Sequence, residues 1–232
     1  MKRNCALTLT CLAGLALSPI CPGQTKVPTR ESTESLRAGA EKGDVAAQFN
    51  LALAYSQGHG VPQDSAEAVR WYRKAAEAGY PEAQHRLGIA YYLGRGVPQD
   101  YAEAVRWYRK AAEAGAAAAQ NNLASAYYIG QGVPQDYAEA VRWYRKAAEA
   151  GYPEAQHRLG IAYNLGRGVP QDYMLAYVWL NLGAATSDSD ERERFAALRD
   201  KVAQKLTPQQ LGEAQRLSRE WKPTVGNTVK AH

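Results

Sequence analysis

The sequence predicts an all-α protein, a solenoid of antiparallel helix pairs with helical caps at both ends. A 36-residue stretch that begins at Gly79 returns from Gly115 and from Gly151, and a diverged copy begins at Gly43. Self-similarity at a period of about 20 to 50 residues is the mark of stacked repeats. Within each copy, apolar residues recur at the three- and four-residue spacing of an amphipathic helix. Glycines and a proline separate two such helices in each copy.

Residues 1–23 have the pattern of a secretory signal peptide. Lys2 and Arg3 precede an apolar run over Cys5–Leu17, and small or turn-forming residues extend to Gly23. This run is shorter than the roughly 20 apolar residues that span a bilayer. We therefore expect an exported protein, periplasmic or secreted, whose mature chain has no membrane span.

The three cysteines also bear on export. Cys5, Cys11 and Cys21 all lie in the signal segment, so the mature chain is expected to hold together by packing without disulfides. Neither Cys11 nor Cys21 follows the small-residue pair of a lipoprotein signal, which disfavours lipid anchoring. The net charge is +5, and acidic and basic residues interleave within each repeat. No clustered basic face for nucleic acid is expected.

The rest of the chain divides by the repeat. We expect a linker and an N-terminal capping helix over 24–42, the helix spanning Glu31–Lys42. Four repeats follow at 43–78, 79–114, 115–150 and 151–186. Two C-terminal capping helices are expected over 187–221, one at 190–206 and the other from Thr207 to near Trp221. Residues 222–232 are polar and expected to be disordered.

The second copy shows the expected local structure. Its first helix, helix A, is predicted over Pro81–Leu93, and Gly88 allows a neighbouring helix to approach closely. Asp100 stands where the second helix, helix B, needs its N-cap, with Glu103 three residues later as in a capping box. An ion pair between Arg109 and Glu113 is expected on the exposed face of helix B.

The fourth copy departs from this pattern. Its helix B carries Met174, Leu175 and Val178 where the other copies have polar or small residues. More of its circumference is therefore apolar and must be covered. The C-terminal capping helices are the expected cover, and without them this repeat would be a docking end.

The sequence of the repeat resembles that of a known family. Leu87-Gly88-Ile89-Ala90-Tyr91, then 94–100, then 104–112 are similar to the Sel1-like repeat, a longer relative of the tetratricopeptide repeat. The resemblance covers 43–186 and implies a right-handed superhelix of helix pairs. It also implies a non-catalytic scaffold that presents a concave surface to a protein or peptide. Some secreted relatives carry a cysteine pair in each repeat and are described as penicillin-binding or β-lactamase-like, but this chain lacks those cysteines.

Three functions follow. The first is an exported scaffold that binds a protein or peptide partner. The second is a cell-wall or β-lactam hydrolase, which the missing cysteines and the lack of a nucleophile motif disfavour. The third is a structural spacer in an envelope complex, with the fourth repeat and the C-terminal helices as its docking end.

Comparison of the copies predicts the binding surface. The recurring Ala, Leu and Tyr of helix A are unchanged in all four copies, whereas other positions vary, and three of these, at i, i+4 and i+7, share one face of the helix. In tetratricopeptide-like folds the corresponding positions line the concave groove, which suits an extended peptide or an amphipathic helix. The predicted groove residues are Phe49, Ser56, His85, Ile89, Tyr92, Asn121, Ser125, Tyr128, His157, Ile161 and Asn164, with Leu53 in the same rows.

Other chemistry is weakly indicated, and no catalytic, cofactor or metal residue is predicted. His85 and His157 are copies of one position, two repeats apart, and no nearby carboxylate or cysteine completes a metal site. The Gly-x-Gly of each loop follows a helix and lacks a third glycine, so a turn is favoured over a phosphate site. The Trp-Tyr-Arg-Lys runs bury their aromatic rings at helical spacing and expose their bases, unlike a single-strand binder.

Overall fold

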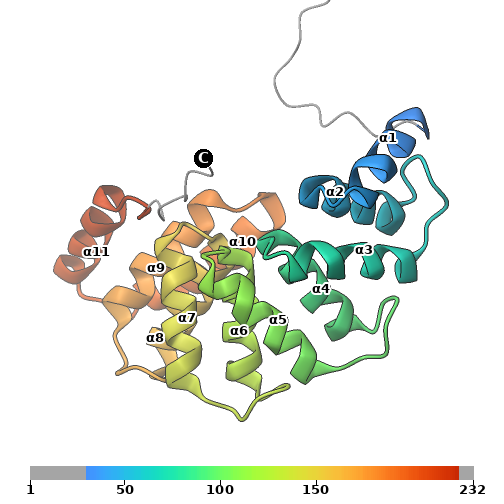
Figure 1. Cartoon of the computed structure of the whole chain (residues 1–232). Coiled ribbons are helices and arrows are strands. Elements are labelled where there is room, and N and C mark those ends of the chain that lie inside the picture. Colours follow the sequence, from blue (N-terminus) through green and yellow to red (C-terminus); the bar gives the residue numbers. More distant parts are fainter. Residues whose placement is uncertain (1–29, 225–232) are drawn as a thin grey trace, which may run out of the picture.

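The computed structural model describes residues 30–224 as a curved array of helices (Figure 1). Over that range it contains eleven helices and no strand. They are α1 (Arg30–Glu41), α2 (Val45–Gln57), α3 (Ser65–Glu77), α4 (Pro81–Leu93), α5 (Tyr101–Glu113), α6 (Ala117–Ile129), α7 (Tyr137–Glu149), α8 (Pro153–Leu165), α9 (Tyr173–Thr186), α10 (Ser189–Ala203) and α11 (Pro208–Glu220). The predicted signal peptide at 1–23 and the linker before Arg30 lie outside the described residues.

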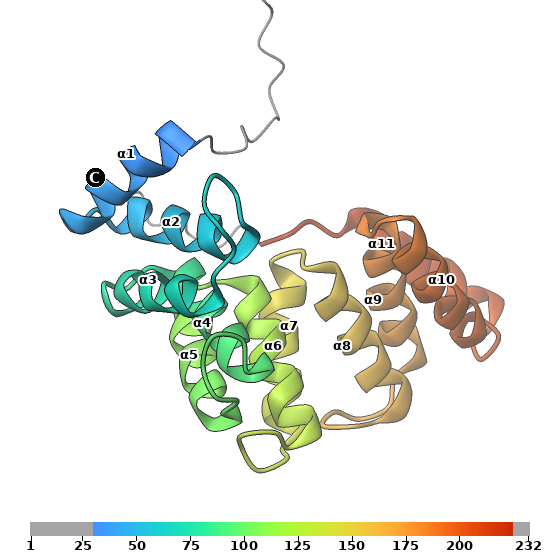
Figure 2. The same cartoon turned by 90° about the vertical axis from the view of Figure 1, so that its right-hand side faces the viewer.

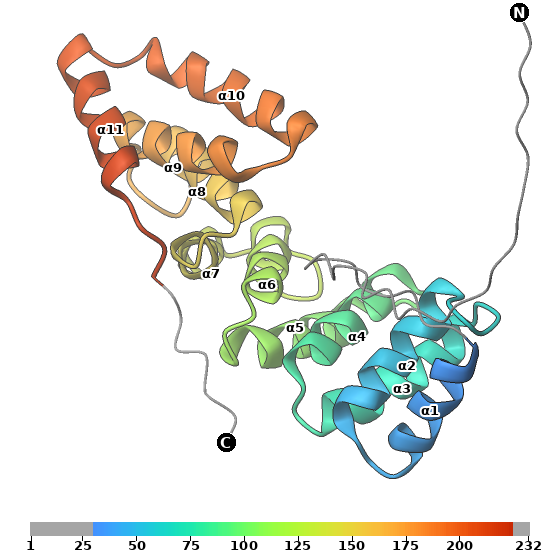
Figure 3. The same ribbon diagram turned by 90° about the horizontal axis from the view of Figure 1, so that it is seen from above.

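The helices stack as pairs, which confirms the predicted solenoid. In each pair helix A (α2, α4, α6 or α8) packs on the helix B that follows it (α3, α5, α7 or α9), and each helix B packs on the next helix A. The array runs from α1 at one end to α10 and α11 at the other (Figures 2 and 3). No helix in the described part of the chain is long and apolar enough to cross a membrane.

Helix A begins and ends where the sequence predicts. The predicted Pro81–Leu93 coincides with α4, and Pro81 occupies its first turn, where a missing N–H costs no intrahelical bond. Gly94 ends the helix in the left-handed conformation at φ 66°, and its amide donates to the carbonyl of Ala90. Gly88 lets α5 approach closely, because a Cβ there would lie 2.6 Å from the Tyr108 ring.

Helix B is capped as predicted, but the capping box is only half formed. Oδ1 of Asp100 accepts from the amides of Ala102 and Glu103 at 2.9 and 3.0 Å. The amide of Asp100 itself donates to the carbonyl of Tyr91 at 3.0 Å, so it does not need the side chain of Glu103. That carboxylate pairs instead with Arg106 at 2.9 Å. The reciprocal half of the predicted box is therefore wrong.

Hydrogen bonds tie each helix B to the next helix A. Arg109 donates to the hydroxyl of Tyr127 at 2.6 Å, which replaces the predicted pair with Glu113. Nε2 of Gln120 donates to the carbonyl of Ala112 at 3.1 Å in the same interface. Equivalent bonds join α3 to α4 and α7 to α8. Each repeat is thus held by its neighbours, as in other solenoids.

The N-terminal capping helix stands at the position of a helix B, and no helix A precedes it within the described residues. It was predicted over Glu31–Lys42 and is observed as α1, one residue earlier at each end. Ser35 and Gly39 stand one repeat before Trp71 and Ala75, which are buried in α3. Gly39 faces Ala47 of α2, whereas Ser35 is exposed, so the outer side of α1 carries a small polar residue where α3 buries a tryptophan, which suits the end of a stack.

At the other end, α10 and α11 both pack on α9. Phe195 and Val202 of α10 and Ala214 of α11 are fully buried, and Trp221 meets Trp179 edge to face at 6.2 Å. The apolar helix B of the fourth repeat is thus packed under α10 and α11, as expected, and Met174 and Leu175 stay partly exposed. Helix α10 starts 36 residues after α8 and occupies the position of a fifth helix A.

The predicted disordered tail, 222–232, is wrong for its first residues. The amide and the hydroxyl of Thr224 donate to the carbonyl of Glu149 at 2.8 and 3.0 Å, at the end of α7. Pro223 lies beside Gly151, with its Cβ 3.6 Å from where a Cβ of that glycine would be. Residues 222–224 therefore dock on the start of the fourth repeat, and 225–232 lie outside the described residues.

Candidate functional site

The predicted groove residues fall into two environments. Most are partly buried side chains on helices A: Phe49, Ser56, His85, Ile89, Tyr92, Ser125, Tyr128, His157, Ile161 and Asn164. The first of the three rows, at positions 49, 85, 121 and 157, packs between successive repeats. Phe49 contacts the rings of Tyr72 and Tyr80 at 5.9 and 5.1 Å. This row therefore contributes to packing as well as to a surface.

This packing covers two of the predicted groove residues, Asn121 and His157. Asn121 is 7% exposed, because it faces the interior of the stack. The ring of His157 stacks on Phe195, with centroids 3.9 Å apart and an interplanar angle of 11°. Helix α10 therefore covers His157. Asn164 also accepts a hydrogen bond from Lys205, just beyond α10, at 3.2 Å. The open part of the predicted face thus lies mainly on α2, α4 and α6, with Ile161 of α8 also partly exposed.

The two histidines are held neutral. Burial, and to a lesser extent the charge of neighbouring Arg86, lower the pKa of His85 to about 4. Burial also lowers the pKa of His157 to about 4; Glu154 opposes this shift, and Arg158 and Arg194 add to it. Nε2 of His85 lies 2.9 Å from the amide nitrogen of Asn122 in α6, which suits an acceptor on a neutral ring. Neither imidazole brings a positive charge to the surface at neutral pH.

These pKa values predict a loss of stability in mild acid. The unfolded chain binds protons on both imidazoles near the ordinary pKa of 6.5, whereas the folded chain binds them only near pH 4. The free energy of unfolding should therefore fall by about 2 kcal/mol for His85 between pH 7 and pH 5, and by about 1 kcal/mol for His157, which solvent screens more. Urea unfolding followed by circular dichroism measures it. A His85→Gln, His157→Gln chain should lose most of this slope, and an unchanged slope would contradict the assignment.

A cavity of 220 Å³ opens between α4, α5 and α6. Ile89, Tyr92 and Ser125 of the predicted groove line it. The other lining residues are Leu93, Tyr101, Ala104, Val105, Tyr108, Asn122, Ala126, Ile129 and Gln131. Leu93 and Ile129 are large apolar side chains that remain 44% and 55% exposed at the mouth. The lining is uncharged, with aromatic and aliphatic walls and three neutral polar side chains.

The cavity lies where the third repeat departs from its neighbours. Ser125 replaces the isoleucine found at positions 89 and 161, and Asn122 replaces the arginine at 86 and 158. Gln131 replaces the arginine at 95 and 167. Each change shortens the side chain or removes its charge. The structure adds Asn122 and Gln131 to the predicted site. The sequence signal for both residues is that the third repeat differs from the second and fourth at these positions.

The next interface along the array shows the closed alternative. There Arg167 donates to the hydroxyl of Tyr128 at 2.8 Å, and its guanidinium lies 5.9 and 5.7 Å from the rings of Tyr128 and Tyr137. The rings themselves meet alike in both interfaces, edge to face at 5.0 Å for Tyr128 and Tyr137 and at 5.3 Å for Tyr92 and Tyr101 in the open interface. Gln131 stands at the position of Arg167 and also lines the cavity. The side chain at this loop position thus distinguishes the two interfaces.

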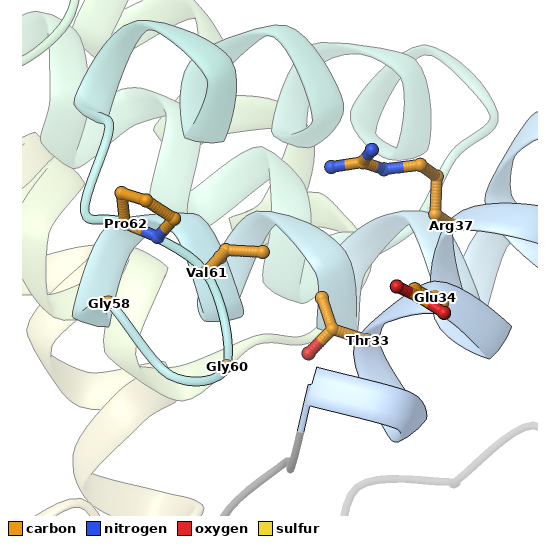
Figure 4. A pocket seen from close by; sticks show the side chains of 7 residues that line it. All are labelled: Thr33, Glu34, Arg37, Gly58, Gly60, Val61 and Pro62. Atoms are coloured by element: carbon orange, nitrogen blue, oxygen red, sulfur yellow. The ribbon is translucent and has the colours of Figure 1, made fainter.

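A larger space, of 660 Å³, lies between α1 and the loop that follows α2 (Figure 4). Thr33, Glu34 and Arg37 line it from α1, and Gly58, Gly60, Val61 and Pro62 from the loop. In the next repeat the equivalent loop rests on the start of helix B, and a Cβ at Gly96 would lie 2.1 Å from the carbonyl oxygen of Ser65. The residue equivalent to Ser65 is Thr29, outside the described range. This space therefore adjoins the edge of the described chain.

Metal chemistry finds no support in the described residues. Between Arg30 and Thr224 no group of three or more histidine, cysteine, aspartate or glutamate side chains is placed to hold a metal ion. His85 contacts Asn122 and Tyr108, and His157 contacts Phe195. Both imidazoles therefore serve the packing between repeats.

Stacked helix pairs, short glycine-containing loops and capped ends define an α-solenoid repeat protein. Comparison with known families then gives the particular one. The model of the Sel1 repeat matches residues 45–80, 81–115, 117–152 and 153–185. The chain belongs to the Sel1 repeat family. It is a scaffold-type protein, and repeats of this class typically mediate protein interactions.

Two solved structures illustrate the likeness. A Sel1 repeat protein from Oxalobacter formigenes is 33% identical, with a TM-score of 0.70 over 83% of this chain and 80% of that one. A protective antigen of uropathogenic Escherichia coli strains, which displays an SLR fold, is 45% identical with a TM-score of 0.66. The match covers 67% of this chain and 33% of the antigen, so this chain spans about a third of that protein's length. No curated protein sequence matches the chain.

Proposed function

We propose that this chain is an exported scaffold that binds a protein or peptide partner through the open face of α2, α4 and α6. The observation that carries the proposal is the cavity between α4, α5 and α6. It lies on the predicted groove face, and exposed apolar side chains stand at its mouth. Exposed apolar side chains beside a cavity are typical of surfaces that receive a partner.

Export is the second part of the proposal, and it rests on the sequence. Lys2, Arg3 and the apolar run to Leu17 have the order of a secretory signal. When the full chain is expressed in a bacterial host, its mass should fall by that of an N-terminal segment ending near Gly23, and the shortened form should fractionate outside the cytoplasm. An unprocessed chain confined to the cytoplasm would contradict export and leave the binding face unaffected.

The binding face is tested by photo-crosslinking in the organism that carries the protein. A photoreactive amino acid is placed at Tyr92, at the mouth of the cavity, in one full chain. In a matched chain it is placed at Arg106, on the exposed face of helix B. We expect a discrete crosslinked partner from position 92 that is absent from position 106. A partner captured only from position 106, or equally from both, would contradict the proposal.

A further inference from the structure

We infer that the cavity between α4, α5 and α6 receives one tyrosine or tryptophan side chain from an extended peptide that carries acidic residues on both sides of it. The inference rests on the proposed function, since it names the partner chemistry of the same face. It adds a specific anchor, a specific repeat and a charge pattern.

The size of the cavity favours a single side chain. Its 220 Å³ exceeds the roughly 150 Å³ of an engineered cavity that accepts benzene, and it is below the about 300 Å³ at which small-molecule pockets begin. One aromatic side chain matches that range. A buried aromatic anchor in a pocket is also the usual source of affinity where a partner binds a protein surface.

The walls favour an aromatic over an aliphatic occupant. Tyr92, Tyr101 and Tyr108 offer ring edges and faces, and aromatic pairs contribute about 0.5 to 1.5 kcal/mol beyond the area that they bury. Ile89 and Val105 add apolar surface. An occupant of this shape would be enclosed by rings and methyl groups.

Neutral polar groups favour an anchor with a polar tip. Asn122, Ser125 and Gln131 line the same cavity and supply amide and hydroxyl groups. Oγ of Ser125 already donates to the carbonyl of Asn121 at 3.0 Å and lies 3.0 Å from the hydroxyl of Tyr144. The amide nitrogen of Asn122 is likewise engaged, 2.9 Å from Nε2 of His85. The amide of Gln131 is thus the better partner for a phenol O–H or an indole N–H. A charged anchor would lose its hydration without finding an opposite charge.

The surroundings set the charge of the flanking residues. Arg95 follows Leu93 by two residues, and Arg167 lies against Tyr128, the neighbour of Ile129. Both arginines are exposed, and neither forms an ion pair with any residue that the structure describes. Gln131, which lines the cavity, stands at the loop position that Arg95 holds one repeat earlier and Arg167 one repeat later, so the loops before and after it each carry a cation without an acidic partner. Acidic residues on both sides of the anchor complement them.

The test uses the full chain and three short peptides, each capped at both ends. The probe is Asp-Gly-Tyr-Gly-Asp; the second peptide has alanine for tyrosine, and the third has lysine for both aspartates. Binding is followed by methyl NMR shifts, with Ile89, Val105 and Ile129 as reporters in the cavity. We expect saturable shifts with the probe, at least tenfold weaker binding of the alanine peptide and weaker binding of the lysine peptide. No shifts with the probe, or equal binding of the alanine peptide, would overturn the inference.

Restoring the sequence of the neighbouring repeats should close the site. Ser125→Ile introduces the residue that the chain itself uses at positions 89 and 161, so the variant is expected to fold. Its affinity for the probe should fall at least tenfold. Ala118→Glu is the matched control, because it restores the residue of positions 82 and 154 on the same helix away from the cavity. Equal binding by wild type and Ser125→Ile would overturn the inference, while crosslinking from position 92 would still support the proposed function.

Discussion

Replacing Gly132 by alanine should lower the free energy of unfolding by about 3 kcal/mol or more. Gly132 has φ 75°, a conformation that L side chains rarely adopt. An added Cβ would also lie 2.2 Å from the carbonyl oxygen of Tyr101, where α5 begins. The clash is with backbone, so no side-chain rotation relieves it, and the contact between the second and third repeats must open. Urea unfolding followed by circular dichroism measures the loss.

Gly115→Ala separates the two causes. Gly115 also has a positive φ, 93°, but a Cβ there would meet no atom within 4 Å. This variant should lose only the conformational term, about 1 to 2 kcal/mol. A similar loss in both variants would show that the packing of the loop on α5 is not what Gly132 provides.

Phe195→Ala should release the C-terminal cap, with a loss of about 3 to 5 kcal/mol. Phe195 is fully buried, and its ring stacks on His157. Because a solenoid loses stability locally, the loss should concentrate in α9, α10 and α11. Hydrogen exchange should show faster exchange in these helices while α2 to α5 keep their protection. Uniformly faster exchange along the chain would contradict a local role.

The other phenylalanine provides the matched control. Phe49 is only partly buried and contacts Tyr72 and Tyr80 near the other end of the array. Phe49→Ala should therefore cost less, about 1 to 2 kcal/mol, and leave α10 protected. The Phe195→Ala variant should also return the pKa of His157 toward 6.5, because the ring that buries it is gone. A His157 that still titrates near pH 4 would place the cause of its low pKa elsewhere.

Much of the local structure follows from residues a few positions apart. The bounds of α4, the glycine that ends it and the aspartate that caps α5 all follow from signals within one helical turn. Four tandem copies of the same sequence pattern predict a stacked architecture. The half-formed capping box depends on more distant residues. The amide of Asp100 donates to the carbonyl of Tyr91 in the preceding helix, so it does not need Glu103 of the helix that Asp100 caps.

The sequence by itself therefore determined the family, the stacked repeat architecture, the caps and the general face on which binding is proposed. Tertiary structure alone decided which residues of that face are open. His157 and His85 have identical neighbours in the sequence, yet His157 lies under Phe195 and His85 contacts Asn122. The difference arises because each helix A is covered by residues about one repeat later in the chain. Burial and cavities depend on those distant neighbours, whereas helices and caps depend on adjacent residues.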